Sequence, residues 1–262
     1  MSKEKRIPVM EIFGPTIQGE GLMSGTVTHF LRTGGCGLRC EWCDTMFAVD
    51  PKQVRAGRTM MTTGEIMTKI SNMPYAPYLT LTGGDPCLHK DLGDIIYALN
   101  MQGIRIAVET QGSLYPAWLK NCDVVTFSPK PPSSGNTVDY HDILEWLQEQ
   151  GGARRTMQVC IKVVVFDSND LEYAMEVYNY MPETHYDSFY LSAGTLLQEP
   201  PSSQEQEVVE ANAMHRLLNV IQSQRALADT IVDMARVNRF NKKFHIGCQQ
   251  HVLMWPEIDQ GV

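Results

Sequence analysis

The chain alternates about six times between strand-like segments and segments with the pattern of amphipathic helices. The strand-like segments are rich in β-branched residues, and they begin at Thr26, Tyr78, Ile104, Asp123, Thr156 and Ser188. Parallel strands must be joined by crossover connections, usually helices, so this alternation predicts a parallel sheet. Six units are too few for a closed eight-stranded barrel. We therefore expect an α/β fold, an incomplete and laterally open (β/α)6 barrel with parallel strands, and we keep an open doubly wound sheet as the alternative.

Several expected helices carry boundary signals. Thr62 and Glu65, at the start of TTGEIMTKI, have the spacing of a capping box, and Ser168 is expected to cap the helix NDLEYAMEVYNYM. The amphipathic segment DLGDIIYALNMQG ends at Gly103, where a left-handed residue can close a helix. The segment LYPAWLKN, residues 114–121, predicts a short helix.

The C-terminal part predicts two helices, over 205–224 and 225–238, followed by extended chain over 243–255. Four apolar residues fall on one face of the first helix: Met214, Leu217, Leu218 and Ile221. The stretches SPKPPSSGN and QEPPSSQEQ are too short to separate domains. We therefore expect a single domain over residues 1–262.

Composition limits the partners. The formal net charge is −8, which argues against nucleic acid or an anionic membrane as the main partner, because both favour a basic surface. The sequence has no apolar run long enough for a membrane span, and its charged start lacks the apolar core of a signal peptide. We expect a cytoplasmic protein.

Three of the seven cysteines form the motif C-x3-C-x2-C at Cys36, Cys40 and Cys43. The other four lie singly, and we interpret them as small buried residues: Cys87, Cys122, Cys160 and Cys248. An odd number of cysteines without an export signal argues against a disulfide framework. A structural zinc site needs four ligands, and His29 is a possible fourth. An iron–sulfur cube held by only three thiolates would instead leave one iron open to an outside ligand.

The polar and glycine-rich motifs follow the predicted strands, at the edge of a parallel sheet where ligands bind. They are the cysteine motif, GGDP at Gly83, ETQG at Glu109, SPK at Ser128 and SAGT at Ser192. The cysteine spacing together with GGDP resembles the radical SAM superfamily, whose open iron binds S-adenosylmethionine (SAM). GGDP has Asp85 where the superfamily usually has glutamate, so Asp85 is expected to order the turn.

Further segments narrow the resemblance to one family within the superfamily. They are EIFGPTIQGEG before the first predicted strand, FLRTGGC, CDT, ETQG, SPKPPSS and the C-terminal HVLMW. From about Met10 to the end, these segments resemble the 7-carboxy-7-deazaguanine synthase family. The resemblance implies a carbon–nitrogen lyase of queuosine and 7-deazapurine biosynthesis. Its substrate is 6-carboxy-5,6,7,8-tetrahydropterin, and its products are 7-carboxy-7-deazaguanine and ammonia. SAM cleavage gives a radical that takes hydrogen from C6 of the pterin, and SAM is then regenerated. Mg2+ orients the substrate.

The resemblance also implies site residues. A 4Fe–4S cluster would be held by Cys36, Cys40 and Cys43, and Mg2+ by Thr45, whose hydroxyl is a hard oxygen donor. SAM would contact Trp42, Cys43, Asp44, Gly84, Ser128, Pro129, Lys130, Ser192 and Thr195. The substrate would be bound by two segments, at about 10–25 and at about 244–262, together with Arg32 and Thr82. The residues contributed by the two segments would be Ile17, Gln18, Gly19, His251 and Val262. Catalytic roles would fall to Glu20, Arg32 and Glu109. The role of Lys162 stays open.

The expected partners are the small pterin substrate, an electron donor of the flavodoxin or ferredoxin type, and a second copy of the chain in a homodimer. Two alternatives remain. A glycyl-radical activase shares the cysteine spacing but has no need of IQGEG or CDT. A non-catalytic iron–sulfur or zinc module has no need of GGDP or SPK.

Overall fold

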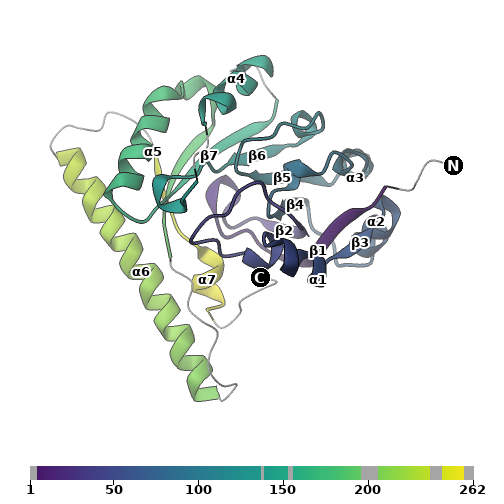
Figure 1. The fold of residues 1–262 in the computed structure, drawn as a ribbon, viewed down its shortest axis with the longest axis horizontal. Coiled ribbons are helices and arrows are strands. Elements are labelled where there is room, and N and C mark those ends of the chain that lie inside the picture. The colour runs from purple at the N-terminus through teal and green to yellow at the C-terminus, as the bar shows by residue number, and fades with distance from the viewer. Residues whose placement is uncertain (1–4, 137–138, 153–155, 196–205, 237–243, 257–262) are drawn as a thin grey trace.

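The computed structural model describes residues 5–136, 139–152, 156–195, 206–236 and 244–256. Its strands lie at the centre and most of its helices on the outside (Figure 1). The strands are β1 (Ile7–Ile17), β2 (Val27–Thr33), β3 (Thr59–Met61), β4 (Tyr78–Gly83), β5 (Arg105–Thr110), β6 (Val124–Phe127), β7 (Gln158–Val165), β8 (Ser188–Ala193) and β9 (His245–Gly247). The α-helices are α1 (Pro51–Gly57), α2 (Thr63–Ser71), α3 (Leu92–Asn100), α4 (His141–Glu149), α5 (Ser168–Tyr180), α6 (Gln206–Arg236) and α7 (Gln250–Met254).

Within the described residues, one sheet has the strand order β3-β1-β2-β4-β5-β6-β7-β8-β9. All neighbours from β2 to β9 are parallel, whereas β1 pairs antiparallel with β2 and with β3. A doubly wound sheet reverses its strand order at a switch point, but here the order follows the chain from β4 to β9. The expected open barrel is therefore confirmed, with β2 and β4 to β8 as its parallel strands, and the doubly wound alternative is wrong.

The two faces of the sheet differ in chemistry. On β4, the side chains of Leu79 and Leu81 are fully buried and belong to one apolar cluster with Ile95 and Leu99 of α3. Burying a side chain of this size stabilises the fold by about 1.5–3 kcal/mol. The alternate residues of the sheet point to the other face, where the Thr28 and Thr80 hydroxyls are hydrogen-bonded at 2.8 Å. The outer face therefore holds the core, and the inner face is polar.

Two helix starts test the capping predictions. The capping box of α2 is confirmed, because the Thr62 hydroxyl accepts from the Glu65 backbone N–H and the Glu65 carboxylate accepts from that of Thr62. The prediction for α5 is wrong by one residue. Asp167 is the N-cap, with its carboxylate accepting from the Asp170 N–H at 3.0 Å, and Ser168 is the first helical residue.

Four other expectations need correction. The segment before Val27, expected only as a motif, contains the eleven-residue strand β1. The expected helix at 114–121 is a single 3-10 turn at Leu119–Asn121. The two expected C-terminal helices are one continuous helix, α6, which lies beside β8 and α7 (Figure 1). Residues 243–255, expected to be extended, contain the short strand β9 and then the helix α7 within their described part.

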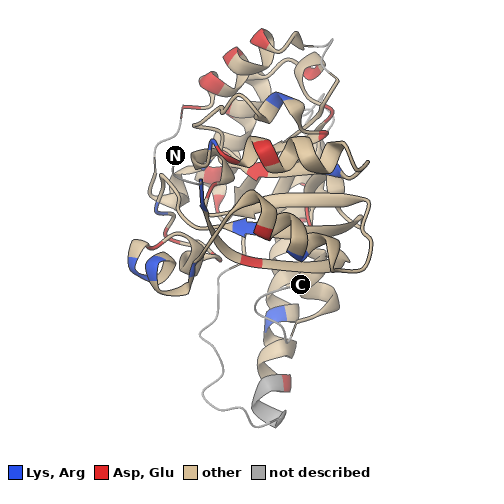
Figure 2. Cartoon of the chain, turned by 90° about the vertical axis from the view of Figure 1, so that its right-hand side faces the viewer, with Lys and Arg blue, Asp and Glu red and all other residues tan. Residues whose placement is uncertain are grey.

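The long helix α6 is buried on one side only. Its buried residues include Val220, Leu227 and Ile231. Three of the four apolar residues predicted to share a face are exposed: Met214, Leu218 and Ile221. No helix of the described chain is long and apolar enough to cross a membrane. Acidic and basic residues are interspersed over the side of the molecule that Figure 2 shows.

Candidate active site

A cavity of about 320 Å³ opens at the carboxyl ends of the parallel strands. It brings together most of the site residues predicted from the sequence, although they come from both ends of the chain. The predicted residues that line it are Gln18, Gly19, Glu20, Arg32, Cys36, Cys40, Trp42, Cys43, Asp44, Thr45, Thr82, Gly84, Glu109, Ser128, Lys130, Ser192, Thr195 and His251. Ile17 and Pro129 are not among the lining residues, and Val262 lies outside the described residues.

The cysteine loop follows β2. Cys43 N–H donates to the Cys40 carbonyl at 3.2 Å, so the two residues share a tight turn. Backbone and side-chain N–H groups approach the sulfurs, from Leu38 to Cys36 Sγ at 3.4 Å and from Asn136 to Cys40 Sγ at 3.6 Å. Such donors stabilise thiolate sulfur bound to iron. Burial raises the pKa of Cys36, and it raises the pKa of Cys40 to about 11, so metal binding must displace protons from these thiols.

The donor set fits a cluster better than a single metal ion. Among the described residues, no three His, Cys, Asp or Glu side chains are grouped closely enough to hold one metal ion. His29 is 2% exposed on β2 and is not among the residues lining the cavity, so the zinc interpretation loses its fourth ligand. Separated thiols on one loop suit a 4Fe–4S cube, in which each cysteine binds a different iron.

None of the other four cysteines lines the cavity. Cys87, Cys122 and Cys160 are buried, as expected, whereas Cys248 is only partly buried. All seven cysteines are free thiols.

The GGDP turn holds the cysteine loop against the end of β4. A side chain at Gly84 would lie 2.2 Å from the Gly35 carbonyl, and one at Gly83, whose φ is +144°, would lie 2.1 Å from the Thr33 carbonyl. Both positions therefore require glycine. Asp85 is fully buried, and its carboxylate accepts from the Cys87 N–H at 3.0 Å and from the Thr110 hydroxyl at 2.9 Å.

Asp85 has a second contact with the cysteine loop, because its backbone N–H donates to the Gly35 carbonyl at 2.8 Å. Burial raises the pKa of its carboxyl group, although the hydrogen bonds from Cys87 and Thr110 act in the opposite direction. Asp85 is absent from the cavity lining. The shorter side chain at this position therefore orders the turn and does not reach the ligand space.

Trp42 and the SPK segment meet on one wall of the cavity. The Trp42 indole N–H donates to Ser133 Oγ at 2.9 Å, and its ring packs against Phe166 with centroids 5.1 Å apart. The Lys130 ammonium lies 5.6 Å from the Trp42 ring centroid and donates to Ser128 Oγ at 3.1 Å. This wall offers an aromatic face and a positive charge beside the cysteines, which suits a ligand with an adenine ring and a carboxylate.

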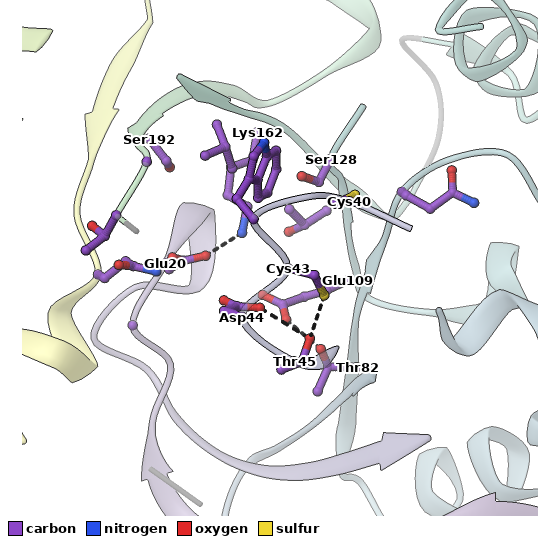
Figure 3. Close-up of a pocket in the computed structure, with 18 of the residues that line it drawn as sticks. Glu20, Cys40, Cys43, Asp44, Thr45, Thr82, Glu109, Ser128, Lys162 and Ser192 are labelled. Atoms are coloured by element: carbon purple, nitrogen blue, oxygen red, sulfur yellow. Dashed lines mark hydrogen bonds and ion pairs between the residues drawn. The ribbon is translucent and has the colours of Figure 1, made fainter. Parts of the chain in front are cut away.

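Thr45 lies at the edge of the cysteine loop (Figure 3). Its hydroxyl donates to the Asp44 carboxylate at 3.2 Å and lies 3.7 Å from Cys43 Sγ. The Thr45 hydroxyl and the Asp44 carboxylate are hard oxygen donors, and Mg2+ in proteins prefers a few such ligands completed by water.

A second group of polar residues lies deeper in the barrel. Both oxygens of the Glu109 carboxylate accept hydrogen bonds, from the Gln18 amide at 3.0 Å and from the Thr82 hydroxyl at 2.9 Å. Glu20 forms an ion pair with Lys162 of β7, and the Glu20 N–H donates to the Gln18 side chain at 3.3 Å. These contacts link the segment after β1 with β4, β5 and β7 in one hydrogen-bonded network.

Charge and burial compete at the ion pair. Burial alone would raise the pKa of Glu20, but the charges of Lys162 and His251 and hydrogen bonds from Lys162 and Gln249 lower it to about 2. Burial alone would lower the pKa of Lys162, but the carboxylates of Glu20 and Glu109 raise it above its usual value. Both groups are therefore ionised at neutral pH.

The N-terminal and C-terminal segments pack together at the cavity. A side chain at Gly19 would lie 2.1 Å from His251 Nδ1, and the Gly19 carbonyl accepts from the Gln250 N–H at 3.0 Å. This contact explains glycine at position 19. It also places His251 of α7 against the loop that carries Glu20.

Arg32 is partly buried at the strand end. Its Nε donates to the Glu11 carboxylate of β1 at 2.6 Å, and its guanidinium lies 5.8 Å from the Phe47 ring centroid. The ion pair fixes one edge of the guanidinium on the cavity wall, where planar forked donors can bind a carboxylate.

Sequence reasoning assigned no individual role to several lining residues: Gln111, Thr126, Lys162, Val164, Phe166, Arg216 and Gln249. Lys162 had a usable signal, because it is the one charged residue in the apolar strand QVCIKVVV. Gln249 lies within the predicted C-terminal segment at about 244–262, but its residue type alone did not single it out. Arg216 had no signal, because an arginine on a long polar helix is usually solvent-exposed.

Comparisons with known proteins agree with this geometry. Residues 30–181 match the family model of the radical SAM superfamily. The 7-carboxy-7-deazaguanine synthase of Bacillus subtilis is 36% identical over 256 residues, which cover 96% of this chain and 97% of that protein. The synthase of the same name from Bacillus cereus is 39% identical over 195 residues, covering 72% and 77%.

A solved structure has the same fold. QueE from Escherichia coli superposes with a TM-score of 0.59 and 24% identity, over 79% of this chain and 87% of that one. Because one relative is similar over nearly its whole length and the superfamily model covers more than half of the chain, the assignment rests on sequence as well as fold. The chain belongs to the 7-carboxy-7-deazaguanine synthase family of the radical SAM superfamily.

Proposed function

We propose that this protein converts 6-carboxy-5,6,7,8-tetrahydropterin to 7-carboxy-7-deazaguanine, with release of ammonia, in a SAM- and Mg2+-dependent radical ring contraction. It would thus be a carbon–nitrogen lyase of queuosine and 7-deazapurine biosynthesis. One observation carries the proposal: a single cavity is lined by the three clustered cysteines and by an acidic, hydrogen-bonded network suited to a pterin. The name shared by the relatives supports the same reaction.

Different residues would bind the cluster and SAM. Cys36, Cys40 and Cys43 would hold a 4Fe–4S cluster, which when bound supplies the electron that cleaves SAM. The wall formed by Trp42 and Lys130 would orient SAM, with Asp44, Gly84, Ser128, Pro129, Ser192 and Thr195 as further contacts. Pro129 would act through the position of its neighbours, because it does not line the cavity.

The pterin would bind among the N-terminal segment at about 10–25, the strand ends and the C-terminal segment at about 244–262. Glu20 would accept hydrogen bonds from the guanidine-like edge of the ring, since carboxylates pair with adjacent N–H donors. Arg32 would hold the substrate carboxylate. The other proposed contacts are Ile17, Gln18, Gly19, Thr82, His251 and Val262.

Glu109 would act as a positioning carboxylate. Gln18 and Thr82 hold both of its oxygens, so its orientation is fixed before substrate arrives. Thr45 would hold Mg2+ through its hydroxyl. The cation, when bound, would help to orient the pterin.

The remaining partners follow from the same proposal. The reaction needs an external one-electron donor of the flavodoxin or ferredoxin type. We also propose that the chain acts as a single domain, forms a homodimer, and works in the cytoplasm on a small molecule, without direct contact with nucleic acid or membrane. The mass of the protein in solution tests the homodimer.

Two other classes fit less well. A glycyl-radical activase acts on a protein partner and gives no role to the network around Glu20 and Glu109. A non-catalytic metal module gives no role to the cavity itself, which the SPK wall and the C-terminal helix α7 enclose together.

The direct test is an anaerobic assay of the reconstituted protein with SAM, Mg2+, a reductant and 6-carboxy-5,6,7,8-tetrahydropterin. We expect a product with the mass and ultraviolet spectrum of 7-carboxy-7-deazaguanine. The Cys40→Ala variant, assayed in parallel, should give none. Cleavage of SAM without consumption of the pterin would rule out the proposed function and favour another radical SAM activity.

A further inference from the structure

The ion pair between Lys162 and Glu20 is built into the wall of the cavity. On β7, the neighbours Ile161 and Val163 point outward and are fully buried in the core. Lys162 points the other way, lines the cavity and is 9% exposed. Its ammonium reaches a carboxylate 142 residues away in the sequence. The barrel thus holds one cation and one anion side by side, facing the space where a ligand binds.

This pair is poorly explained as a stabilising element. Removing two charges from water costs about as much free energy as their attraction returns, and apolar side chains of similar volume often stabilise a buried site as well or better. The neighbours of Lys162 along β7 are valine and isoleucine, so an apolar residue would fit the strand pattern. The ion pair therefore points to a role toward a ligand.

Its donor and acceptor pattern is specific. The Glu20 carboxylate presents two acceptor oxygens, and Lys162 presents three N–H donors, one of which Glu20 accepts. A ligand edge that matches both groups needs two adjacent donors followed by an acceptor. The pyrimidine ring of a pterin has this pattern in its 2-amino group, its N3–H and its C4 oxygen.

The charges required for this match are maintained by the site. The pKa of Glu20 is held near 2, and that of Lys162 lies above its usual value, so the carboxylate accepts and the ammonium donates across the neutral range. In Figure 3, the contact between Glu20 and Lys162 is distinct from the contacts that join Thr45 to Asp44 and Cys43.

We propose that Lys162 is a specificity-determining residue that donates a hydrogen bond to the C4 oxygen of the bound pterin, while Glu20 accepts from the adjacent N3–H and 2-amino groups. This assignment rests on the proposed function, because it requires a pterin in the cavity. Lys162 selects a 4-oxo ring, and Glu20 selects the two donors beside it.

The test compares two ligands that differ only at this atom. 6-Carboxypterin and its 4-thioxo analogue both keep the 2-amino group and N3–H, but sulfur is the weaker acceptor. Dissociation constants are measured by fluorescence titration of the anaerobic holoenzyme with SAM and Mg2+. A hydrogen bond from a charged donor corresponds to about a 10- to 100-fold preference of the native protein for the oxo ligand.

Lys162→Met should weaken 6-carboxypterin binding by about 10- to 100-fold and bring the two dissociation constants to within about threefold of each other. Glu20→Gln is the matched control, because Glu20 is proposed to accept from the N3–H and 2-amino groups, which both ligands have. It should weaken both ligands and keep their ratio. A merely structural role for Lys162 would also weaken both ligands equally and leave the ratio as in the native protein.

Lys162→Met leaves a buried carboxylate without its partner and so threatens folding. The double variant Glu20→Gln with Lys162→Met removes both charges, and it too should bind the oxo and thioxo ligands with similar affinity. The inference is overturned if the native protein does not distinguish the ligands, or if either Lys162 variant keeps the native ratio. Failure of the proposed function looks different: the native protein would then bind neither pterin and consume no carboxytetrahydropterin.

Discussion

The cavity has two sides that are built in different ways. The cysteine side, formed by Cys36, Cys40, Cys43 and Thr45, lies within one ten-residue loop. The proposed pterin side, formed by Gln18, Glu20, Glu109 and Lys162, is joined by contacts across 91 and 142 residues of sequence. The first side offers sulfur and backbone donors, and the second offers ionised groups. The cofactor and the substrate should therefore respond to different substitutions, although they meet in one space.

The largest expected effect is on the cysteine side. Replacing Cys36, Cys40 or Cys43 with alanine should abolish the brown colour, the bound iron and SAM cleavage, because each thiolate would hold one iron of the cluster. Affinity for 6-carboxypterin, measured by fluorescence titration, should stay within about threefold of native, because the cysteines do not belong to the side of the cavity that is proposed to bind the pterin. A threefold change in affinity corresponds to about 0.7 kcal/mol.

The matched control for this prediction is a buried cysteine outside the loop. Cys122→Ala should keep the full iron content, since Cys122 lies in the apolar core away from the cavity. If Cys122, or another of the scattered cysteines, proved as necessary for iron binding as the clustered three, the ligand assignment would be wrong.

A smaller effect is expected at Arg32, on the pterin side. Arg32→Lys keeps the charge but loses the planar fork, which the structure uses at one edge to bind Glu11. We expect about a 10- to 100-fold loss of affinity for the carboxytetrahydropterin with unchanged iron content. Arg105→Lys is the control, because Arg105 pairs with Asp123 at the opposite ends of the strands and should bind substrate normally. Unchanged substrate affinity in Arg32→Lys would show that Arg32 does not hold the carboxylate.

Thr45, on the cysteine side, tests whether that side also acts on the substrate through Mg2+. Thr45→Ala should keep iron and SAM binding but reduce the Mg2+ activation of turnover by roughly tenfold, because an oxygen ligand is lost. Thr45→Ser should retain most activity, since only a methyl group is removed. The measurement is a Mg2+ titration of turnover under anaerobic conditions. Identical activation curves for the native protein and Thr45→Ala would place the metal elsewhere.

The smallest effect is expected for a substitution on the outside of the barrel, which should leave both sides of the cavity intact. Thr62→Ala removes the capping box of α2, which lies on the outside of the barrel, and should cost about 1 kcal/mol of folding stability. Thermal unfolding should shift downward by a few degrees, roughly as expected for a protein of this size. Iron content and pterin affinity should not change. A loss of either would mean that the site depends on the outer helices more strongly than the contacts indicate.

The sequence predicted the parts of the fold that rest on local patterns. Strand and helix alternation predicted the open barrel, and the spacing of Thr62 and Glu65 predicted a helix start that the structure confirms. The cap of α5 was misplaced by one residue because Asp167 and Ser168 are both good caps, and local sequence does not choose between them.

The errors involve tertiary packing. Strand β1 was missed because it contains Pro8, Gly14 and Pro15, which are unusual inside strands, whereas its pairing with β2 stabilises it as a strand. The helix α6 continues through Arg225 because no helix breaker separates the two predicted segments. The same limit applies to the site. Cysteine ligands within one eight-residue motif can be read from the sequence, but the pairing of Lys162 with Glu20 exists only once the barrel has closed around the cavity.

The central claim is that the cysteine side presents SAM to a pterin held by the other side of the same cavity. It is tested most directly with carboxytetrahydropterin deuterated at C6, incubated anaerobically with the native protein, SAM, Mg2+ and a reductant. Mass spectrometry should detect deuterium in the recovered SAM pool, at the 5′ carbon, as 7-carboxy-7-deazaguanine accumulates. Product formation with no deuterium in SAM, or SAM cleavage with the deuterated pterin untouched, would contradict this account.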